Sequence, residues 1–492
     1  MKQLFILLFV AILLAIYTPL FAQDQKPLDT GAVDTYIKKY MKKNKIPGLA
    51  LSIVHNDEIV YTQGYGIARP DGTPVTPQTP FLICSLSKSF TALAIMQLVE
   101  AGKIDLDAPI QKYLTWFTLA DPKAAEQIKI HHLLSHTSGI SQLTGNKDIL
   151  SDDMHDDVLE NSIRELSNAR LNRPVGESYE YSNINYAILG LVAQVVSGQS
   201  YESYIKEHIF TPLDMNNSYT SKTEAEAHGL ATGHTYFFGH PLVRTNVSFP
   251  RRLLPAGFLM SSSEDMGHYL LAQINNRNYR GVKILSPEYI ALMRQPIVKT
   301  QNEDSYYVSG WVTKIYKGEP LFYMDGNFFN FHGDMAFLPK RGWGIAVLIN
   351  YNGGLTVPHI LSEPVNEVFR LASGYDTGNL APNILGIVLA FFGILIFIIL
   401  LNIICWGVFY FRRWHSTRQL RIIWQFILPL FIDIVLTWYI LIFTPKQVPI
   451  TLSVLLSMAP DVGLVLIACG ATVALTALIR IAVYIAFARC KE

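Results

Sequence analysis

The sequence predicts an α/β domain with an inserted helical region, followed by three membrane helices. Strand-like runs lie at both ends of the central region, helical patterns fill the stretch between them, and three long apolar stretches follow near the C-terminus. The central region holds roughly 350 residues, which is enough to bury a large core without disulfides. Three of the four cysteines lie in the apolar tail, so Cys84 has no partner for an intramolecular disulfide in the central region.

The central region contains each kind of element in turn. Residues 30–43 have the spacing of an amphipathic helix. Residues 48–61 contain two β-rich runs around a His-Asn-Asp turn, which predicts a hairpin. A segment with helical periodicity ends at Gly102, which is a typical helix stop. Residues 150–196 have a helix-rich pattern, and residues 343–350 are typical of a buried strand.

The first 22 residues have the pattern of a secretory signal peptide. Lys2 precedes an apolar run over residues 4–17, and Ala22 ends the segment before a polar stretch. An uncleaved anchor is the alternative, but Pro19 and the abrupt change in polarity after Ala22 favour cleavage. The sequence therefore predicts that residues 1–22 are removed on export.

The tail contains three apolar stretches, at residues 384–410, 422–443 and 462–487. Each is long enough to cross the roughly 30 Å hydrocarbon core of a membrane as a helix. The connection after the first stretch carries four arginines, whereas the second connection has Lys446 as its basic residue. By the positive-inside rule, the first connection and the C-terminus are cytoplasmic and the preceding domain is outside. We therefore expect three transmembrane helices within residues 384–488, a multi-pass location in the cell membrane, an extracytoplasmic domain, and membrane lipid as a partner.

Charge excludes one large class of partners. The formal net charge is +1 at pH 7, and the charged residues make up 16% of the chain. Nucleic-acid binding needs a basic face that neutralises phosphates. The sequence therefore predicts no nucleic-acid partner.

Ser85 and Lys88 form a Ser-x-x-Lys motif at or near the start of a helix. Residues three apart share one helical face, so the two side chains are neighbours. A serine hydroxyl needs an adjacent base to act as a nucleophile, and a desolvated lysine with a lowered pKa can be that base. The helix N-terminus also stabilises negative charge that develops there. The motif alone is not specific, because Ser203 and Lys206 repeat it on an apparently ordinary surface helix.

A second motif, Tyr181-Ser182-Asn183, lies well downstream. The phenol of Tyr181 can relay a proton between nucleophile and leaving group, and the Asn183 amide can hold a substrate carbonyl or the lysine. With these motifs the sequence resembles the serine β-lactamases and penicillin-binding proteins, specifically the class C β-lactamase and D-alanyl-D-alanine carboxypeptidase branch. The resemblance covers most of residues 30–350 and includes three further segments, at residues 98–107, 132–139 and 255–261.

This resemblance implies a β-lactamase-like fold over residues 23–375, with an antiparallel sheet flanked by helices and a helical subdomain. It implies that Ser85 is the acylated nucleophile, Lys88 the base, and Tyr181 the partner acid or base. No metal and no cofactor are then expected. The resemblance also makes three nearby histidines structural residues rather than ligands of a metal: His131, His132 and His136.

The third motif of the family is a Lys or His followed by Thr-Gly or a similar pair on a strand, and here the sequence departs from the pattern. Met324-Asp325-Gly326 occupies that position. Gly326 still lets the backbone approach a substrate, and the Asn327 N–H can join that of the nucleophile in an oxyanion hole. Together with Asn183, these two are the candidate substrate-binding residues. Met324 cannot neutralise a substrate carboxylate, which argues against tight binding of β-lactams and D-Ala C-termini.

The sequence therefore predicts a membrane-anchored, extracytoplasmic serine hydrolase that acts on amides or esters through an acyl-enzyme on Ser85. A small molecule or a peptide is the expected substrate: peptidoglycan peptides, β-lactams, small esters and N-acyl-D-amino-acid peptides all fit. The arrangement is similar to that of the peptidases that mature colibactin and zwittermicin precursors, so a D-amino-acid-directed peptidase that matures a secreted peptide is one alternative. A non-catalytic, penicillin-sensor-like binding module is another, and the presence of all four motif residues argues against it: Ser85, Lys88, Tyr181 and Asn183.

Overall fold

A computed structural model describes most of the central region and part of the tail. The described residues are 28–374, except for short gaps at 148, 246–247, 276–278, 302–303 and 353–360, and, in the tail, 393, 396–397, 428–438 and 452–489. The predicted signal peptide, residues 1–22, lies outside them.

The centre of the molecule is an antiparallel sheet whose strand order is β2-β1-β12-β11-β10-β9-β8-β7. The predicted hairpin supplies β1 and β2, and the predicted buried strand is β12, all of whose residues are buried. Because β1 pairs with β12, the two ends of the domain meet near the β2 edge of the sheet. The strands are β1 (Gly48–His55), β2 (Glu58–Gly66), β7 (Val298–Lys299), β8 (Ser305–Val308), β9 (Trp311–Tyr316), β10 (Glu319–Asn327), β11 (His332–Leu338) and β12 (Trp343–Ile349).

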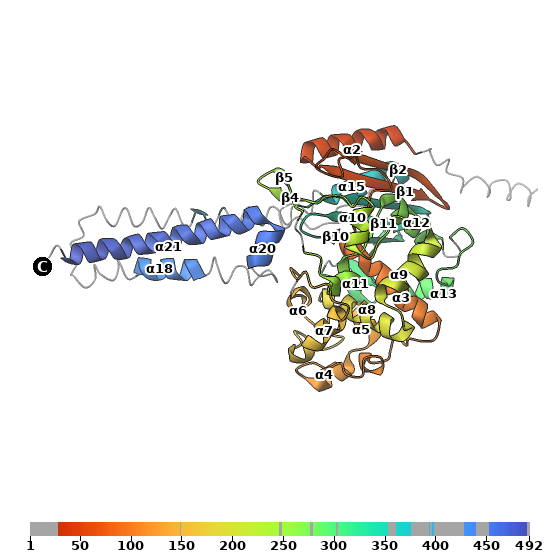
Figure 1. The fold of residues 1–492 in the computed structure, drawn as a ribbon, viewed down its shortest axis with the longest axis horizontal. Helices are drawn as coiled ribbons and strands as arrows, with labels where there is room; N and C mark the ends of the chain where they lie inside the picture. The colour runs from red at the N-terminus through yellow and green to blue at the C-terminus, as the bar shows by residue number, and fades with distance from the viewer. Residues whose placement is uncertain are drawn as a thin grey trace, which may run out of the picture.

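Two helices cover one face of this sheet: α2 (Thr30–Asn44), which is the predicted amphipathic helix, and α15 (Glu363–Ser373) (Figure 1). Asp29 caps α2 by accepting a hydrogen bond from the Ala32 N–H at 2.9 Å. The buried positions of α15 recur at helical spacing, as the period of an amphipathic helix requires, and include Val365, Val368 and Phe369. Burying a side chain of this size contributes roughly 1.5–3 kcal/mol.

The opposite face packs against α12 (Ser263–Ile274) and a larger helical region built around α3 (Ser87–Glu100) and α8 (Asn183–Ser197). Every residue of α3 from position 87 to 96 is buried, because other helices surround it. The smaller helices are α4 (Pro122–Gln127), α5 (Ile130–Leu134), α6 (Gln142–Asn146), α7 (Val158–Arg164), α9 (Tyr201–Ile205), α10 (Lys222–Ala227), α11 (Leu254–Gly257) and α13 (Pro287–Met293).

The helix-rich pattern over residues 150–196 resolves into α7 and α8. Between them, residues 169–182 form an irregular segment that carries part of the site described below. Short strands complete the fold: β3 (Phe81–Leu82) pairs with β6 (Met260–Ser261), and β4 (His234–Phe237) lies between β5 (His240–Val243) and β13 (Tyr351–Asn352).

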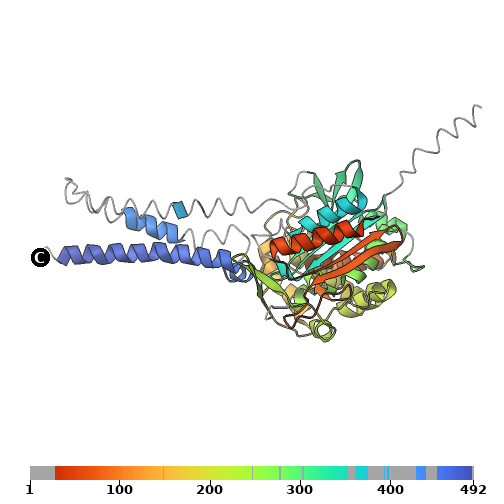
Figure 2. The same cartoon turned by 90° about the horizontal axis from the view of Figure 1, so that it is seen from above.

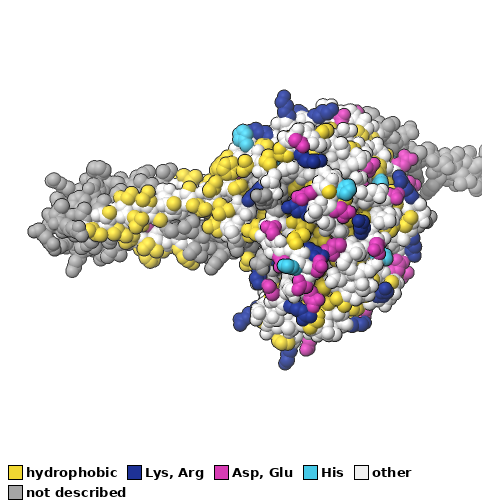
Figure 3. All heavy atoms as spheres, viewed as in Figure 1, with side chains coloured by type: hydrophobic (Ala, Val, Ile, Leu, Met, Phe, Trp, Pro, Cys, Tyr) yellow, Lys and Arg dark blue, Asp and Glu magenta, His cyan; other side chains and the backbone are white. Residues whose placement is uncertain are grey.

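The described part of the tail is helical and projects from the domain (Figures 1 and 2). It contains α18 (Leu428–Trp438), α20 (Leu452–Met458) and α21 (Pro460–Arg489), and α18 lies against α21. Hydrophobic side chains cover this part of the tail, whereas Lys, Arg, Asp and Glu are scattered over the domain (Figure 3). Arg244, just after β5, donates a hydrogen bond to the Ser457 carbonyl and so joins the domain to the tail.

Of the three predicted membrane helices, the described residues support one. Pro460–Ile479, within α21, is long and apolar enough to span a membrane, with a mean hydropathy of 2.5. The stretch at 422–443 is described only over α18, which is too short to test the prediction. The stretch at 384–410 lies almost entirely outside the described residues. That the first two stretches also span the membrane therefore stays a prediction.

Candidate active site

A tight turn presents Ser85 between the sheet and the helical region. Residues Cys84–Leu86 form a 3₁₀ turn, and α3 begins directly after it. Cys84 has a φ of 50°, a left-handed conformation that is uncommon for a residue with a side chain. Its buried Sγ lies 3.7 Å from the Leu82 carbonyl and 3.6 Å from the Phe331 carbonyl. The buried Cys84 side chain therefore holds the turn in place, while Ser85 itself stays partly exposed.

Lys88 lies one turn into this segment and is completely buried. Its Nζ is 3.2 Å from Ser85 Oγ, 2.8 Å from Asn183 Oδ1 and 2.5 Å from the Ala256 carbonyl oxygen. Two of these neighbours can only accept hydrogen bonds, so a neutral amine would donate to both and keep its lone pair for the serine hydroxyl. Burial lowers the pKa of Lys88 well below its usual value, which favours that neutral form. The geometry is that of a base poised on Ser85.

Tyr181 approaches the same hydroxyl from the other side. Its phenol oxygen is 2.7 Å from Ser85 Oγ, and Lys88 Nζ lies 4.7 Å from the centre of its ring. Burial raises the pKa of Tyr181 well above its usual value, so the free site holds a neutral phenol. A neutral phenol is able to give a proton to a leaving group. The structure thus brings together the three residues to which the sequence assigns catalytic roles.

Asn183, the first residue of α8, holds Lys88 in place. Its Oδ1 accepts the hydrogen bond from Lys88, and its Nδ2 donates to Asn146 Oδ1 at 2.8 Å. The sequence left two roles open for this amide, holding a substrate carbonyl or holding the lysine. Both ends of the amide contact protein groups, and the carbonyl end contacts the lysine.

His136 supports Tyr181 from behind, and its position is not apparent from the sequence. The two rings lie 4.6 Å apart between centroids, and His136 is completely buried. His136 Nδ1 accepts hydrogen bonds from the Ser182 N–H at 3.2 Å and from Asn185 Nδ2 at 3.0 Å. Burial and the neighbouring Lys88 lower the pKa of His136, so the ring is neutral. A neutral, doubly anchored ring fixes the Tyr181-Asn183 segment, which has little regular structure of its own.

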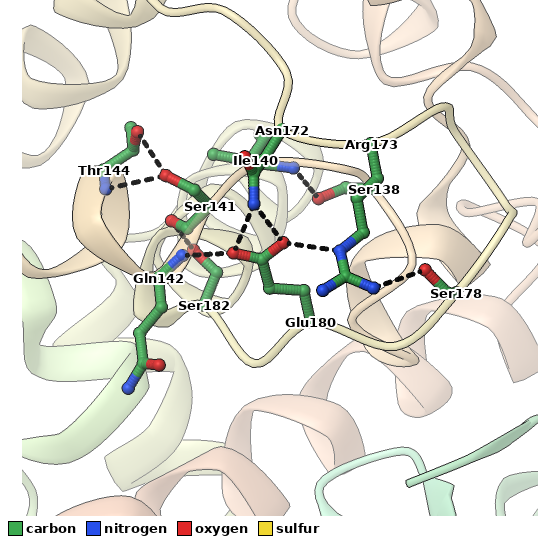
Figure 4. Close-up of polar contacts among 10 residues, drawn as sticks. All are labelled: Ser138, Ile140, Ser141, Gln142, Thr144, Asn172, Arg173, Ser178, Glu180 and Ser182. Carbon is green, nitrogen blue, oxygen red and sulfur yellow. Dashed lines mark hydrogen bonds and ion pairs between the residues drawn. The ribbon is translucent and has the colours of Figure 1, made fainter. Parts of the chain in front are cut away.

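Glu180 anchors the same segment from its solvent side (Figure 4). Its carboxylate accepts hydrogen bonds from the Gln142 N–H at 3.2 Å, from Asn172 Nδ2 at 2.9 Å and from Arg173 Nε at 3.0 Å. Ser182 Oγ adds a bond to the Ser141 carbonyl at 2.9 Å. A partly exposed ion pair contributes little stability by itself. Glu180 instead ties together two loops that hold Tyr181 against Ser85.

The predicted third motif lies on β10, beside the turn that carries Ser85. A Cβ atom at Gly326 would lie 2.8 Å from the Ile83 carbonyl oxygen and 2.9 Å from the Ser85 nitrogen, so a glycine is required for this close approach. Met324 is buried in the core, whereas Asn327 is exposed at the end of the strand. Pairing between β10 and β9 ends at Tyr323, so on that side residues 324–327 have no partner strand among the described residues.

A chain of polar side chains runs behind this end of β10. Asn327 Nδ2 donates to the Asp325 carboxylate at 2.8 Å, and Asn327 Oδ1 lies 2.9 Å from His332 Nδ1. His332 Nε2 lies 2.8 Å from Asp334 Oδ2. His332 is completely buried. Burial lowers the pKa of His332, but the carboxylates of Asp334 and Asp325 outweigh that effect and leave it above its usual value.

The repeated Ser-x-x-Lys motif has none of these surroundings. Ser203 Oγ contacts Ser200 Oγ at 2.9 Å, and the exposed Lys206 pairs with Glu224 at 3.2 Å. Ser203 is thus a matched control for Ser85.

The antiparallel sheet, the helical region and the cluster between them define the class of serine hydrolases to which the β-lactamases belong. A family model described as Beta-lactamase matches residues 33–362. The chain therefore belongs to the β-lactamase family.

Among individual relatives, Protein flp of Staphylococcus aureus (strain MW2) is 30% identical over 344 residues, which cover 68% of this chain and 66% of the relative. Penicillin-binding protein 4 of Amycolatopsis lactamdurans is 28% identical over 349 residues, which cover 70% of this chain and 89% of the relative. Among solved structures, the octameric penicillin-binding protein homologue from Pyrococcus abyssi is 31% identical with a TM-score of 0.56, over 66% of this chain and 74% of that chain. The predicted family and its fold are thus confirmed.

Proposed function

We propose that the protein hydrolyses amides or esters through an acyl-enzyme on Ser85. Lys88 takes the hydroxyl proton as Ser85 Oγ bonds to the substrate carbonyl carbon. The carbonyl oxygen becomes an oxyanion, which the N–H groups of Ser85 and Asn327 stabilise. As the bond to the leaving group breaks, Tyr181 gives that group its phenolic proton. Water then attacks the ester on Ser85, and the same residues act in reverse.

The placement of Ser85 Oγ between Tyr181 and Lys88, at 2.7 Å and 3.2 Å, carries this proposal. Nucleophile, base and acid are within reach of one another before substrate binds, which is the arrangement that covalent catalysis needs. A binding module that forms no covalent bond would have no use for a buried lysine whose other neighbours are both acceptors.

We further propose that the enzyme is exported and held by three C-terminal membrane helices, with the site outside the membrane. The apolar helix Pro460–Ile479 and the arginine-rich connection after residue 410 support this arrangement. The substrate would then be an extracytoplasmic small molecule or peptide. Met324 offers no cation to bind a substrate carboxylate. We therefore expect that the substrate is neither a carboxylate-bearing β-lactam nor a D-Ala-D-Ala peptide.

Activity-based labelling tests the assignment of Ser85. A fluorophosphonate should label wild type and Ser203→Ala equally, and should fail to label Ser85→Ala. Labelling of Ser85→Ala at the wild-type level would refute the nucleophile. A fluorescent penicillin, used in parallel, should label weakly. Stable penicillin labelling without turnover of any ester or amide would instead identify a penicillin-binding sensor.

A further inference from the structure

Asp325 places a negative charge at the edge of the proposed active site. It precedes Gly326, whose backbone touches the Ser85 turn, and its side chain is exposed although its neighbour Met324 is buried. Burial is the main cause of the raised pKa values of Tyr179 and Tyr181, and the charge of Asp325 adds to both. The carboxylate therefore acts on the groups that surround the nucleophile.

Nearby protein groups fix the Asp325 carboxylate: its packed surroundings and the neighbouring carboxylate of Asp334 raise its pKa, whereas the charge of His332 and the hydrogen bond from Asn327 oppose that rise. Both ring nitrogens of His332 face oxygen atoms, those of Asn327 and Asp334, so the ring has the surroundings of an imidazolium. The direct ion pair of that imidazolium is with Asp334. Asp325 receives a neutral amide N–H from Asn327, and within the described part of the chain it forms no ion pair.

Three basic side chains among the described residues, those of Lys88, Arg251 and His332, are each engaged or buried. Burial drives Lys88 toward its neutral amine. Arg251 pairs with Glu202 at 2.9 Å and with Asp156 at 2.5 Å. His332 is completely buried and cannot reach a substrate. A substrate beside Ser85 thus meets an anion where the resemblance leads one to expect a cation and a hydroxyl.

We propose that Asp325 determines the specificity of the Ser85 site, and that the preferred substrates carry a protonated amine or a guanidinium beside the scissile bond. A carboxylate forms charge-assisted hydrogen bonds with such groups and repels a substrate carboxylate. The rings of Tyr179 and Tyr181 add aromatic faces, which also attract cations. This inference rests on the proposed hydrolase function and names its substrate class.

Two series of matched substrates test the inference, one for each side of the scissile bond. The first series is S-acetyl-2-(dimethylamino)ethanethiol, whose protonated amine carries one N–H donor, its neutral analogue 3-methylbutyl thioacetate, and anionic S-acetyl-3-mercaptopropionate. The second is alanine p-nitroanilide with a free, an acetylated or a succinylated amine, in D and L forms. In at least one series, wild type should prefer the cationic over the anionic member in kcat/KM by about 10- to 150-fold, the range that one charge-assisted hydrogen bond provides.

Asp325→Asn keeps an oxygen that accepts the Asn327 hydrogen bond and removes the charge. The Asp325→Asn variant should show a preference for the cationic over the anionic substrate that is at least about tenfold smaller than in wild type. Added salt should also reduce this preference in wild type. The control is Asp57→Asn, which removes the same charge from the exposed β1–β2 turn at the opposite end of the strands and should leave the preference unchanged. Fluorophosphonate labelling of every variant reports that Ser85 is intact.

Each outcome bears on a different claim. If Asp325→Asn lowers kcat/KM equally for all members of a series, Asp325 is structural and the inference is overturned. If wild type hydrolyses cationic, neutral and anionic members equally well in both series, the inference fails while the Ser85 hydrolase stands. If the fluorophosphonate does not label Ser85 in wild type, the proposed function fails and the inference fails with it.

Discussion

Replacing Lys88 with methionine separates the chemistry of the site from its stability. Methionine has a similar length and no charge, so it fills the same buried space. It cannot take a proton from Ser85, and loss of a general base typically lowers the rate about 10²- to 10⁴-fold. We therefore expect the rate of acylation by a fluorophosphonate or an activated ester to fall by at least about 100-fold.

The expected change in the free energy of unfolding is small, because two effects oppose each other. Asn183 Oδ1 and the Ala256 carbonyl lose a donor, which costs roughly 1–3 kcal/mol for a buried acceptor left unsatisfied. Removing the buried amine also removes the cost of desolvating a polar group, which is roughly 1–3 kcal/mol. The net change should lie within about 2 kcal/mol, which corresponds to a shift in Tm of a few degrees.

The dependence of stability on pH provides a second measurement. Because burial lowers the pKa of Lys88, the folded state binds fewer protons than the unfolded chain between that lowered pKa and about 10.4, the usual lysine value. The contribution of Lys88 to stability therefore rises with pH in that window, and Lys88→Met should remove this slope. Acylation rates and thermal melts at pH 7 and 9.5 test both expectations. A variant that acylates within threefold of wild type would refute Lys88 as the base, and a fall in Tm of more than 10 °C would show that its hydrogen bonds to Asn183 and Ala256 are structural.

Three further predictions concern the role of Tyr181, the effect of Met324 on substrate choice, and the topology of the tail. Tyr181→Phe should lower kcat/KM for amides by about 10²- to 10⁴-fold but much less for p-nitrophenyl esters, whose leaving group needs no proton; equal losses would argue against Tyr181 as the acid. Wild type should hydrolyse a neutral ester faster than a cephalosporin or a D-Ala-D-Ala peptide, and Met324→His should narrow that gap; efficient turnover of D-Ala-D-Ala peptides by wild type would contradict this. A reporter active only in the cytoplasm should work when fused after Glu492 and fail near Gln447; activity at Gln447 would overturn the three-helix topology.

The central pieces of the fold were predictable because they depend on local patterns. Two β-rich runs and the turn residues between them predicted the β1–β2 hairpin, and a continuous apolar run predicted β12. Ser85 and Lys88 are also a local pair, three residues apart on one turn. Tyr181 lies 96 residues further along the chain than Ser85, and it was found through the family motif rather than through any local signal. The spatial meeting of all three agrees with the motif-based prediction, and their catalytic roles stay predictions.

The residues that the sequence did not reveal are those whose roles depend on contacts between distant segments. His136 packs against Tyr181 although it lies 45 positions earlier in the chain. Glu180 forms hydrogen bonds with two irregular loops. Asp325 lies within the third motif of the family, for which the sequence predicts the loss of a cation at Met324. The signal present in the sequence was the carboxylate of Asp325 at the position where the family motif has a hydroxyl. The sequence alone could not show what surrounds this carboxylate, because His332 and Asp334 lie behind it only through the pairing of β10 with β11.

The unpaired end of β10 has a consequence for how ligands are recognised. Beyond Tyr323 no described strand lies along residues 324–327 on the side of β9, so backbone N–H and C=O groups remain there for a ligand. A substrate in an extended conformation can add itself to the sheet as a short strand, with main-chain hydrogen bonds that do not depend on its side chains. Such main-chain hydrogen bonds would select an extended substrate, and Asp325 would then select among extended substrates by charge. Flat peptidomimetics that end in a basic group are therefore the natural starting point for inhibitors of this protein.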